Sequence, residues 1–178
     1  MGNHNLELKE TIEYLQRPGN IVDWWGPALV TSNTVHGNKT FGNLYRLLRL
    51  PRANQTLLCF GFIYNMQDFD GSVTVENVLD VIQSAWFTTV LQNRDSYDAI
   101  VILAHMDVQD DLVKEILAVV RTVAGADVVV QFVTGHTHKR DYVTLDSHAS
   151  SIQAGFFWIP WDSCHSIQSC LKQISFIP

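Results

Sequence analysis

Two uninterrupted apolar runs, each the length of a strand, constrain the fold of this chain most strongly. Residues 99–104 and 127–133 carry apolar side chains at almost every position, which is typical of strands buried on both faces. Between them, residues 111–123 have the spacing of an amphipathic helix, and Asp110 and Asp111 are placed to cap and charge its start. A buried strand, a helix and a second buried strand predict an α/β layered architecture.

The remaining pattern fits the same class. Residues 6–15 and 75–91 have apolar positions near a period of 3.6, which predicts two further helices. Strands are predicted over residues 28–33 and 56–64, while residues 43–50 alternate imperfectly and end at Pro51. The stretch from Ser147 onward shows no clear period, and no repeat or linker divides the chain, so we expect a single domain.

Composition narrows the function classes. The 178 residues are 47% hydrophobic and 17% charged, against about a quarter charged in typical domains, which excludes a disordered chain. A net charge of -6 provides no basic surface for nucleic acid. No run approaches the roughly 20 apolar residues of a membrane span. The excess of apolar over charged residues predicts exposed apolar surface and poor solubility when the chain is expressed alone.

Cysteines and glycosylation sequons leave the compartment undecided. Three cysteines without a Cys-x-x-Cys pair argue against a disulfide framework and a zinc knuckle. The N-terminus lacks a signal-peptide pattern. Two N-x-S/T sequons, at Asn38 and Asn54, keep a secretory or vacuolar route open.

Three places combine metal-binding residue types with a favourable setting. His105 directly follows one buried strand, and Gly135-His136-Thr137-His138 follows the next; ligands collect at such carboxyl ends of strands. Asn3 and His4 precede the first predicted helix. Each place alone also fits a loop histidine or a frayed terminus, but together they favour a metal site. Imidazole suits zinc, manganese and iron alike, so the metal is left open.

These blocks resemble the calcineurin-like metallophosphoesterase superfamily. Gly2-Asn3-His4 looks like its Gly-Asn-His-Asp/Glu block, Ala104-His105 like its isolated histidine block, and residues 135–138 match its Gly-His-x-His block. The order agrees. Residues 31–33, 86–87, 138–142 and 146–150 are similar to the 5′-nucleotidase branch, especially its fungal members. The resemblance runs from residue 1 to about Gly155.

The resemblance implies an α/β/β/α sandwich and a centre of two divalent metals. Asn3, His105 and His136 would ligate one metal and His138 the other, while His4 would assist the leaving oxygen or stabilise transition-state charge. The implied reaction is in-line attack of a metal-bound hydroxide on a phosphoester or nucleotide.

Several departures from the family qualify that expectation. Its Asp-x-His and Gly-Asp-x-x-Asp blocks lie before Gly-Asn-His, so we expect residues 1–155 to be the latter part of a catalytic domain, with N-terminal strands missing and activity impaired. Position 5 is Asn rather than an acid. Residues 156–178 form a divergent C-terminal tail, in which Cys164, His165 and Cys170 could make a metal clip.

Other readings remain open at this point. The chain could be a pseudoenzyme or inert fragment that acts only by binding, with no partner protein identifiable. A dinucleotide binder or serine hydrolase is disfavoured because neither a Gly-rich phosphate loop nor Gly-x-Ser-x-Gly occurs. Capping accounts for Asp110 and Asp111 better than ligation does, and a solvated loop suits Lys139 and Arg140 better than a phosphate contact.

Overall fold

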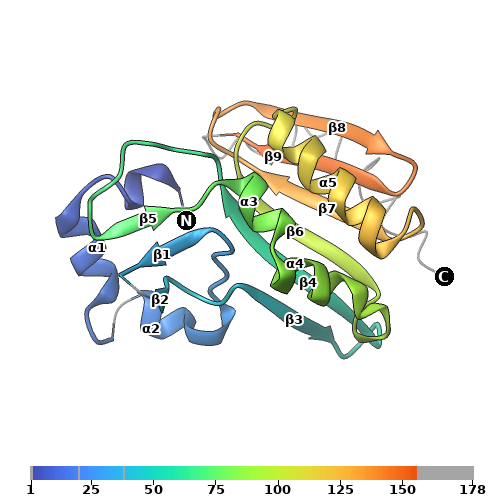
Figure 1. Ribbon diagram of the computed structural model, residues 1–178, viewed down its shortest axis with the longest axis horizontal. Helices are drawn as coiled ribbons and strands as arrows, with labels where there is room; N and C mark the ends of the chain where they lie inside the picture. The colour runs from blue at the N-terminus through green and yellow to red at the C-terminus, as the bar shows by residue number, and fades with distance from the viewer. Residues whose placement is uncertain (1, 20, 38, 156–178) are drawn as a thin grey trace, which may run out of the picture.

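The computed structural model describes residues 2–19, 21–37 and 39–155, so the predicted tail, its clip residues and Asn38 lie outside the described part. The described helices and strands are shown in Figure 1. The helical elements are η1 (Asn3–Asn5), α1 (Lys9–Gln16), α2 (Ile21–Trp25), η2 (Gly26–Ala28), α3 (Val78–Gln83), α4 (Ala85–Gln92), η3 (Arg94–Ser96) and α5 (Asp111–Ala124). The strands are β1 (Thr34–His36), β2 (Lys39–Thr40), β3 (Tyr45–Leu50), β4 (Gln55–Ile63), β5 (Val73–Val75), β6 (Ala99–His105), β7 (Val129–Thr134), β8 (Arg140–Asp146) and β9 (Ala149–Ala154).

A six-stranded mixed sheet in the order β3-β4-β6-β7-β9-β8 forms the centre of the described structure. The strands β4, β6, β7 and β9 are parallel, and β3 and β8 run antiparallel at the two edges. A smaller sheet, β2-β1-β5, lies beside it with α1 and α2 (Figure 1). The predicted α/β class is confirmed.

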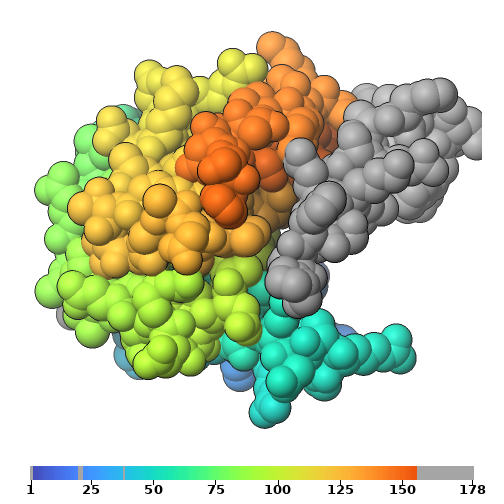
Figure 2. All heavy atoms as spheres, turned by 90° about the vertical axis from the view of Figure 1, so that its right-hand side faces the viewer, coloured from blue at the N-terminus to red at the C-terminus, as the bar shows by residue number. Residues whose placement is uncertain are grey.

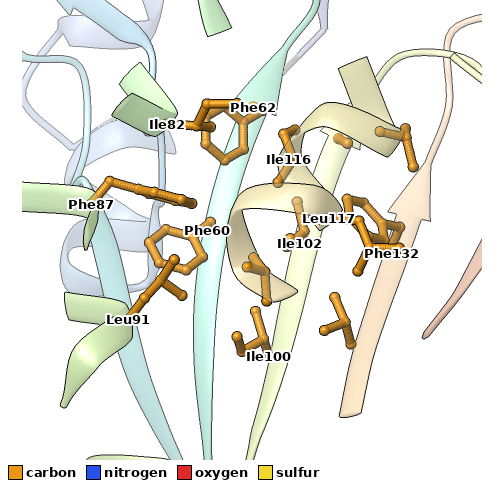
Figure 3. Close-up of a cluster of buried hydrophobic side chains, with 14 of the residues drawn as sticks. Phe60, Phe62, Ile82, Phe87, Leu91, Ile100, Ile102, Ile116, Leu117 and Phe132 are labelled. Atoms are coloured by element: carbon orange, nitrogen blue, oxygen red, sulfur yellow. The ribbon is translucent and has the colours of Figure 1, made fainter. Parts of the chain in front are cut away.

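Helices α3, α4 and α5 cover one face of the large sheet and form its core with it. Alternate residues of each strand point into this core, so Phe60, Ile102 and Phe132 are all fully buried (Figure 3). Phe87 of α4 packs against Phe60 with ring centroids 4.8 Å apart. A 22-residue buried cluster of this kind supplies the main hydrophobic stabilisation of the described fold.

The opposite face of the sheet is open at its centre. Leu103, Val129 and Val133 alternate with the core residues and are 47%, 37% and 42% exposed. Leu48 on β3 is 36% exposed on the same face, because it pairs with Leu57 rather than with a core-facing residue. The exposed apolar surface expected from composition is therefore present. It lies partly on this face and partly elsewhere, since Trp24 of α2 is 85% exposed and Leu47 of β3 is 44% exposed.

The small sheet is tied to the large one where residues 30–33 cross β4. Gly61 of β4 lies so close to Val30 that a Cβ there would be 2.3 Å from the Val30 carbonyl oxygen. The Asn33 side chain bonds both the amide and the carbonyl of Ile63, at 3.0 and 2.8 Å. These side-chain bonds to the backbone replace the predicted strand over 28–33, where the structure shows only an isolated bridge at Val30.

Two predicted helices differ in the structure. The single helix predicted over 75–91 is divided into α3 and α4, because Ser84 is extended with ψ of 150° and its hydroxyl accepts from the Phe87 amide at 3.4 Å. Val75 belongs to β5. The helix predicted from Leu6 begins only at Lys9, after η1.

The stretch from Ser147 onward is not irregular as predicted, since β9 begins at Ala149 and pairs with β7 and β8. Its alternation was concealed because two of its three buried positions are polar. Ser151 and Gln153 are 0% and 1% exposed, and they form side-chain hydrogen bonds with Thr134 and Thr137. The turn between β3 and β4 projects from the body of the molecule (Figure 2), and its sequon residue Asn54 is exposed.

Candidate metal centre

The parallel strands bring the predicted histidine blocks to one edge of the sheet. In the β6–β7 register Ala104 pairs with Thr134, so His105 and Gly135 are the next residues along two adjacent strands. The rings of His105 and His136 lie with centroids 5.1 Å apart. The expectation that these blocks meet at the carboxyl ends of β6 and β7 is therefore met by the geometry.

Asn3 joins the two imidazoles from the beginning of the chain. Its side-chain Oδ1 lies 2.9 Å from His105 Nε2, and the residue is 8% exposed. Gly2 allows this approach, because a Cβ at that position would be 3.0 Å from the His105 ring. Residues 3, 105 and 136 thus converge, although 102 positions separate the first two in sequence.

Glu7 fixes the orientation of both predicted site residues in the first block. Its carboxylate accepts from Asn3 Nδ2 at 2.7 Å and from His4 Nδ1 at 3.0 Å. Because a carboxylate only accepts, the Asn3 amide must turn its oxygen toward His105. Hydrogen bonds from His4 and Asn3 lower the Glu7 pKa below its ordinary value. The His4 side chain is 81% exposed, so its Nε2 edge is available to solvent.

Glu7 was not among the residues predicted from the sequence. A signal was present, because Glu7 follows His4 by three positions and a helical turn brings such residues together. The Asn found at position 5 has a structural partner: its Oδ1 accepts from the Gly2 amide at 3.0 Å and closes the first turn.

His105 is electrostatically unlike an ordinary histidine. Burial and, after it, the neighbouring His136 lower its pKa to about 4, with weaker contributions in the same direction from the chain terminus, His4 and His138. At neutral pH its imidazole is therefore uncharged, which is the form that ligates metals.

The turn that carries His136 and His138 has an uncommon backbone. Both histidines have positive φ angles, 84° and 60°, which non-glycine residues rarely adopt. The His136 ring packs against Tyr64 at 4.7 Å between centroids. The hydroxyl of Thr137 donates to Asp107 Oδ2 at 2.9 Å, so Asp107 holds this turn as a hydrogen-bond acceptor.

The donor set fits a metal in part. Two imidazoles and one amide oxygen meet here, which are ligand types used by zinc, manganese and iron. Within the described residues, however, no group of three His, Cys, Asp or Glu side chains could hold a metal ion. His138 follows His136 on the same turn.

Other carboxylates considered from the sequence have structural partners. Asp110 caps α5 by accepting from the Leu112 amide at 2.9 Å, and Asp111 pairs with Lys114 at 2.7 Å, so the capping prediction is confirmed. The one Asp-x-His tripeptide, at residues 146–148, lies in the turn between β8 and β9, at the opposite end of the parallel strands. Its Asp146 pairs with Arg121 at 2.8 Å.

A cavity of about 530 Å³ opens beside the cluster on the open side of the sheet. His105, Gly2 and Gly135 form one end, while Leu103 and Val133 belong to its apolar wall. The hydroxyl of Thr31, another lining residue, is buried without a hydrogen-bond partner among the described residues. The described helices include none that is both long and apolar enough to span a bilayer.

Comparisons with known proteins give three fungal relatives. The chain is 30% identical over 168 residues to the uncharacterized protein YHR202W of Saccharomyces cerevisiae and 29% identical over 164 residues to the uncharacterized protein C1039.02 of Schizosaccharomyces pombe. It is 26% identical over 183 residues to a protein of Arthroderma benhamiae named as a secreted protein. These matches cover 88%, 87% and 95% of this chain. The chain spans only 26–28% of the length of these relatives.

The fold is similar to part of one solved structure. The crystal structure of 5′-nucleotidase from Candida albicans superposes with a TM-score of 0.79 over 86% of this chain and 29% of that chain, at 24% sequence identity. No protein-family model matches the chain. The described part of this chain is therefore an α/β domain with a central sheet flanked by helices, similar in fold to a 5′-nucleotidase.

Proposed function

We propose that this chain carries part of the active site of a metal-dependent phosphoester hydrolase. The observation that supports it most is the meeting of Asn3, His105 and His136 at the carboxyl edge of a sheet whose fold is similar to a 5′-nucleotidase. The proposed substrates are phosphoesters, with nucleotides the first class to test because of that similarity. Two divalent ions are proposed for the complete centre, one held by Asn3, His105 and His136 and the other by His138.

The residues of this chain have distinct proposed roles. The Asn3 amide and the His105 and His136 imidazoles supply neutral ligand atoms, so they hold a divalent ion without cancelling its charge. When bound, such ions acidify water and neutralise phosphate charge. His4 is exposed and its Nδ1 is held by Glu7, so its Nε2 can face a leaving oxygen and hold or donate a proton there.

A second function is favoured by the incomplete donor set. The described residues lack a group of three His, Cys, Asp or Glu ligands. This supports weak metal binding and a role as a binding protein or pseudoenzyme. The first proposal expects hydrolysis that depends on bound metal, whereas the second expects no hydrolysis.

Metal content and hydrolysis measured together test the proposal. We expect at most one Mn²⁺ or Zn²⁺ per chain by inductively coupled plasma mass spectrometry, and weak hydrolysis of p-nitrophenyl phosphate that depends on this ion. His136→Ala should abolish both. His148→Ala is the matched control, because that histidine lies in the exposed turn after β8. A metal content of zero in the parent chain would favour the binding-only function, and metal retained by His136→Ala would contradict the proposed ligand set.

Glu7 provides an independent test of the same centre. Glu7→Gln keeps the side-chain shape but replaces one acceptor oxygen by an NH₂ group, so the side chain can no longer accept from both Asn3 and His4. We expect metal affinity to fall about 10- to 100-fold, the usual range for outer partners of ligands. Glu13→Gln is the control, since Glu13 pairs only with the exposed Lys9 on α1. Isothermal titration with Mn²⁺ measures both variants, and an unchanged affinity for Glu7→Gln would contradict this role.

A further inference from the structure

A chain of three side chains joins the ends of three strands next to the candidate metal centre. The Thr137 hydroxyl donates to Asp107 at 2.9 Å and accepts from Gln153 Nε2 at 2.6 Å. Asp107 follows β6, Thr137 follows β7 and Gln153 belongs to β9. We call these three residues the Thr137 clasp.

The direction of these hydrogen bonds is fixed by chemistry. An ionised carboxylate only accepts, so Thr137 must give its single proton to Asp107 and can offer only a lone pair to Gln153. Both oxygens of Asp107 are used in this way, since Oδ1 accepts from the Gln109 amide and Oδ2 accepts from Thr137, each at 2.9 Å. Gln153 is then obliged to turn its NH₂ group toward Thr137.

That obligation leaves one buried acceptor unused. Gln153 is 1% exposed, and its Oε1 has no hydrogen-bond partner among the described residues. A buried polar atom without a partner is unfavourable. The residues on either side of Thr137 add a second cost, because His136 and His138 both have positive φ. Unfavourable features of this kind persist where the surrounding contacts enforce them, and they gather at functional sites.

We infer that the Thr137 clasp positions His136 and His138 for metal binding. Thr137 lies between them, so anchoring its side chain to β9 and to the loop after β6 fixes the two peptide units from which both histidines extend. His136 is thereby held against His105 and Tyr64, at 5.1 and 4.7 Å between ring centroids. The inference rests on the proposed function for its metal, but the ordering of the turn exists without one.

Thr137→Val tests the clasp because valine has the shape of threonine and can neither donate nor accept. We expect Co²⁺ affinity, followed by visible absorbance, to fall at least tenfold, while Thr137→Ser, which keeps the hydroxyl, binds within threefold of the parent chain. Thr122→Val is the matched control, because its exposed hydroxyl donates to the Ala118 carbonyl within α5, away from the clasp. Equal Co²⁺ affinity in Thr137→Val and the parent would overturn the inference.

Hydrogen–deuterium exchange of the metal-free proteins separates failure of the clasp from failure of the proposed function. Thr137→Val should speed exchange in a peptide spanning residues 135–139 and leave β6 and α5 unchanged, with Thr137→Ser like the parent. If the parent binds no Co²⁺, the proposed function fails and the metal-positioning inference fails with it, whatever the exchange shows. If the parent binds Co²⁺ but exchange in this peptide does not change, the clasp does not order the turn and the inference is overturned.

Discussion

His105 combines two environments that act on its protonation in the same direction. Burial and the neighbouring His136 lower its pKa to about 4, below the ordinary 6.5 that applies in the unfolded chain. Between those two values the unfolded chain takes up a proton and the folded one does not. Lowering the pH from 6.5 toward 4 therefore favours unfolding, and the contribution is fully retained above 6.5.

We expect the free energy of unfolding to fall by about 1–2 kcal/mol between pH 7 and pH 4.5 from this residue, a figure discounted for its partial exposure. Urea denaturation of the parent and of His105→Gln measures it, because the variant should have a flatter pH dependence over that interval. His148→Gln, in the exposed turn, should keep the parental slope. Parallel slopes in the parent and His105→Gln would contradict the assigned burial.

At the residue scale, sequence reasoning selected candidate site residues whose side-chain types are common metal ligands. His105, His136 and Asn3 were placed because each lies beside a recognisable strand end or motif. Glu7 and Gln153 were not found, since a glutamate in a first helical turn and a glutamine in a polar stretch are ordinary residues. Their importance depends on distances of 2.7 and 2.6 Å to Asn3 and Thr137.

At the element scale, the helices and strands with the clearest hydrophobic periodicity were predicted most accurately. Helix α5 was predicted closely because five of its buried positions follow helical spacing and Asp110 marks its start. The break at Ser84 escaped prediction because apolar spacing continues across it. Strand β9 escaped because two of its three buried side chains, Ser151 and Gln153, are polar and form hydrogen bonds to β7 and the loop after it.

The cap of α5 gives the prediction that belongs to this scale. Asp110→Ala removes the acceptor for the Leu112 amide, so we expect about 1 kcal/mol lower stability. Asp111→Ala, one position later, loses an exposed pair with Lys114 and should lower stability by less than the loss of the cap does. Thermal denaturation by circular dichroism compares the two. Equal losses would show that the Asp110 cap contributes nothing beyond surface charge.

At the scale of the whole molecule, the open face of the sheet has the largest consequence for behaviour in solution. Leu103 and Val133 sit at adjacent register positions on β6 and β7, so their exposed side chains form one apolar surface beside the cavity. Apolar area of this kind favours association with other molecules.

We expect the chain to bind the dye ANS and to self-associate at micromolar concentration, as seen by light scattering. Leu103→Lys should reduce both, because a charge at the centre of the face opposes its burial. Leu79→Lys is the control, because Leu79 is also exposed, at 37%, but lies on α3 at the other side of the sheet. A monomeric parent chain that binds no ANS would contradict the expectation.

The close crossing at Gly61 has a consequence for how this protein would tolerate random change. Any side chain there would meet the Val30 carbonyl at 2.3 Å and push residues 30–33 away from β4. Those residues connect the N-terminal elements, and hence Asn3, to the strands that carry His105. In a saturation-mutagenesis screen scored by activity, position 61 would therefore tolerate as few substitutions as the histidines themselves. Such a screen would make Gly61, a residue required for close backbone packing, look like a catalytic residue.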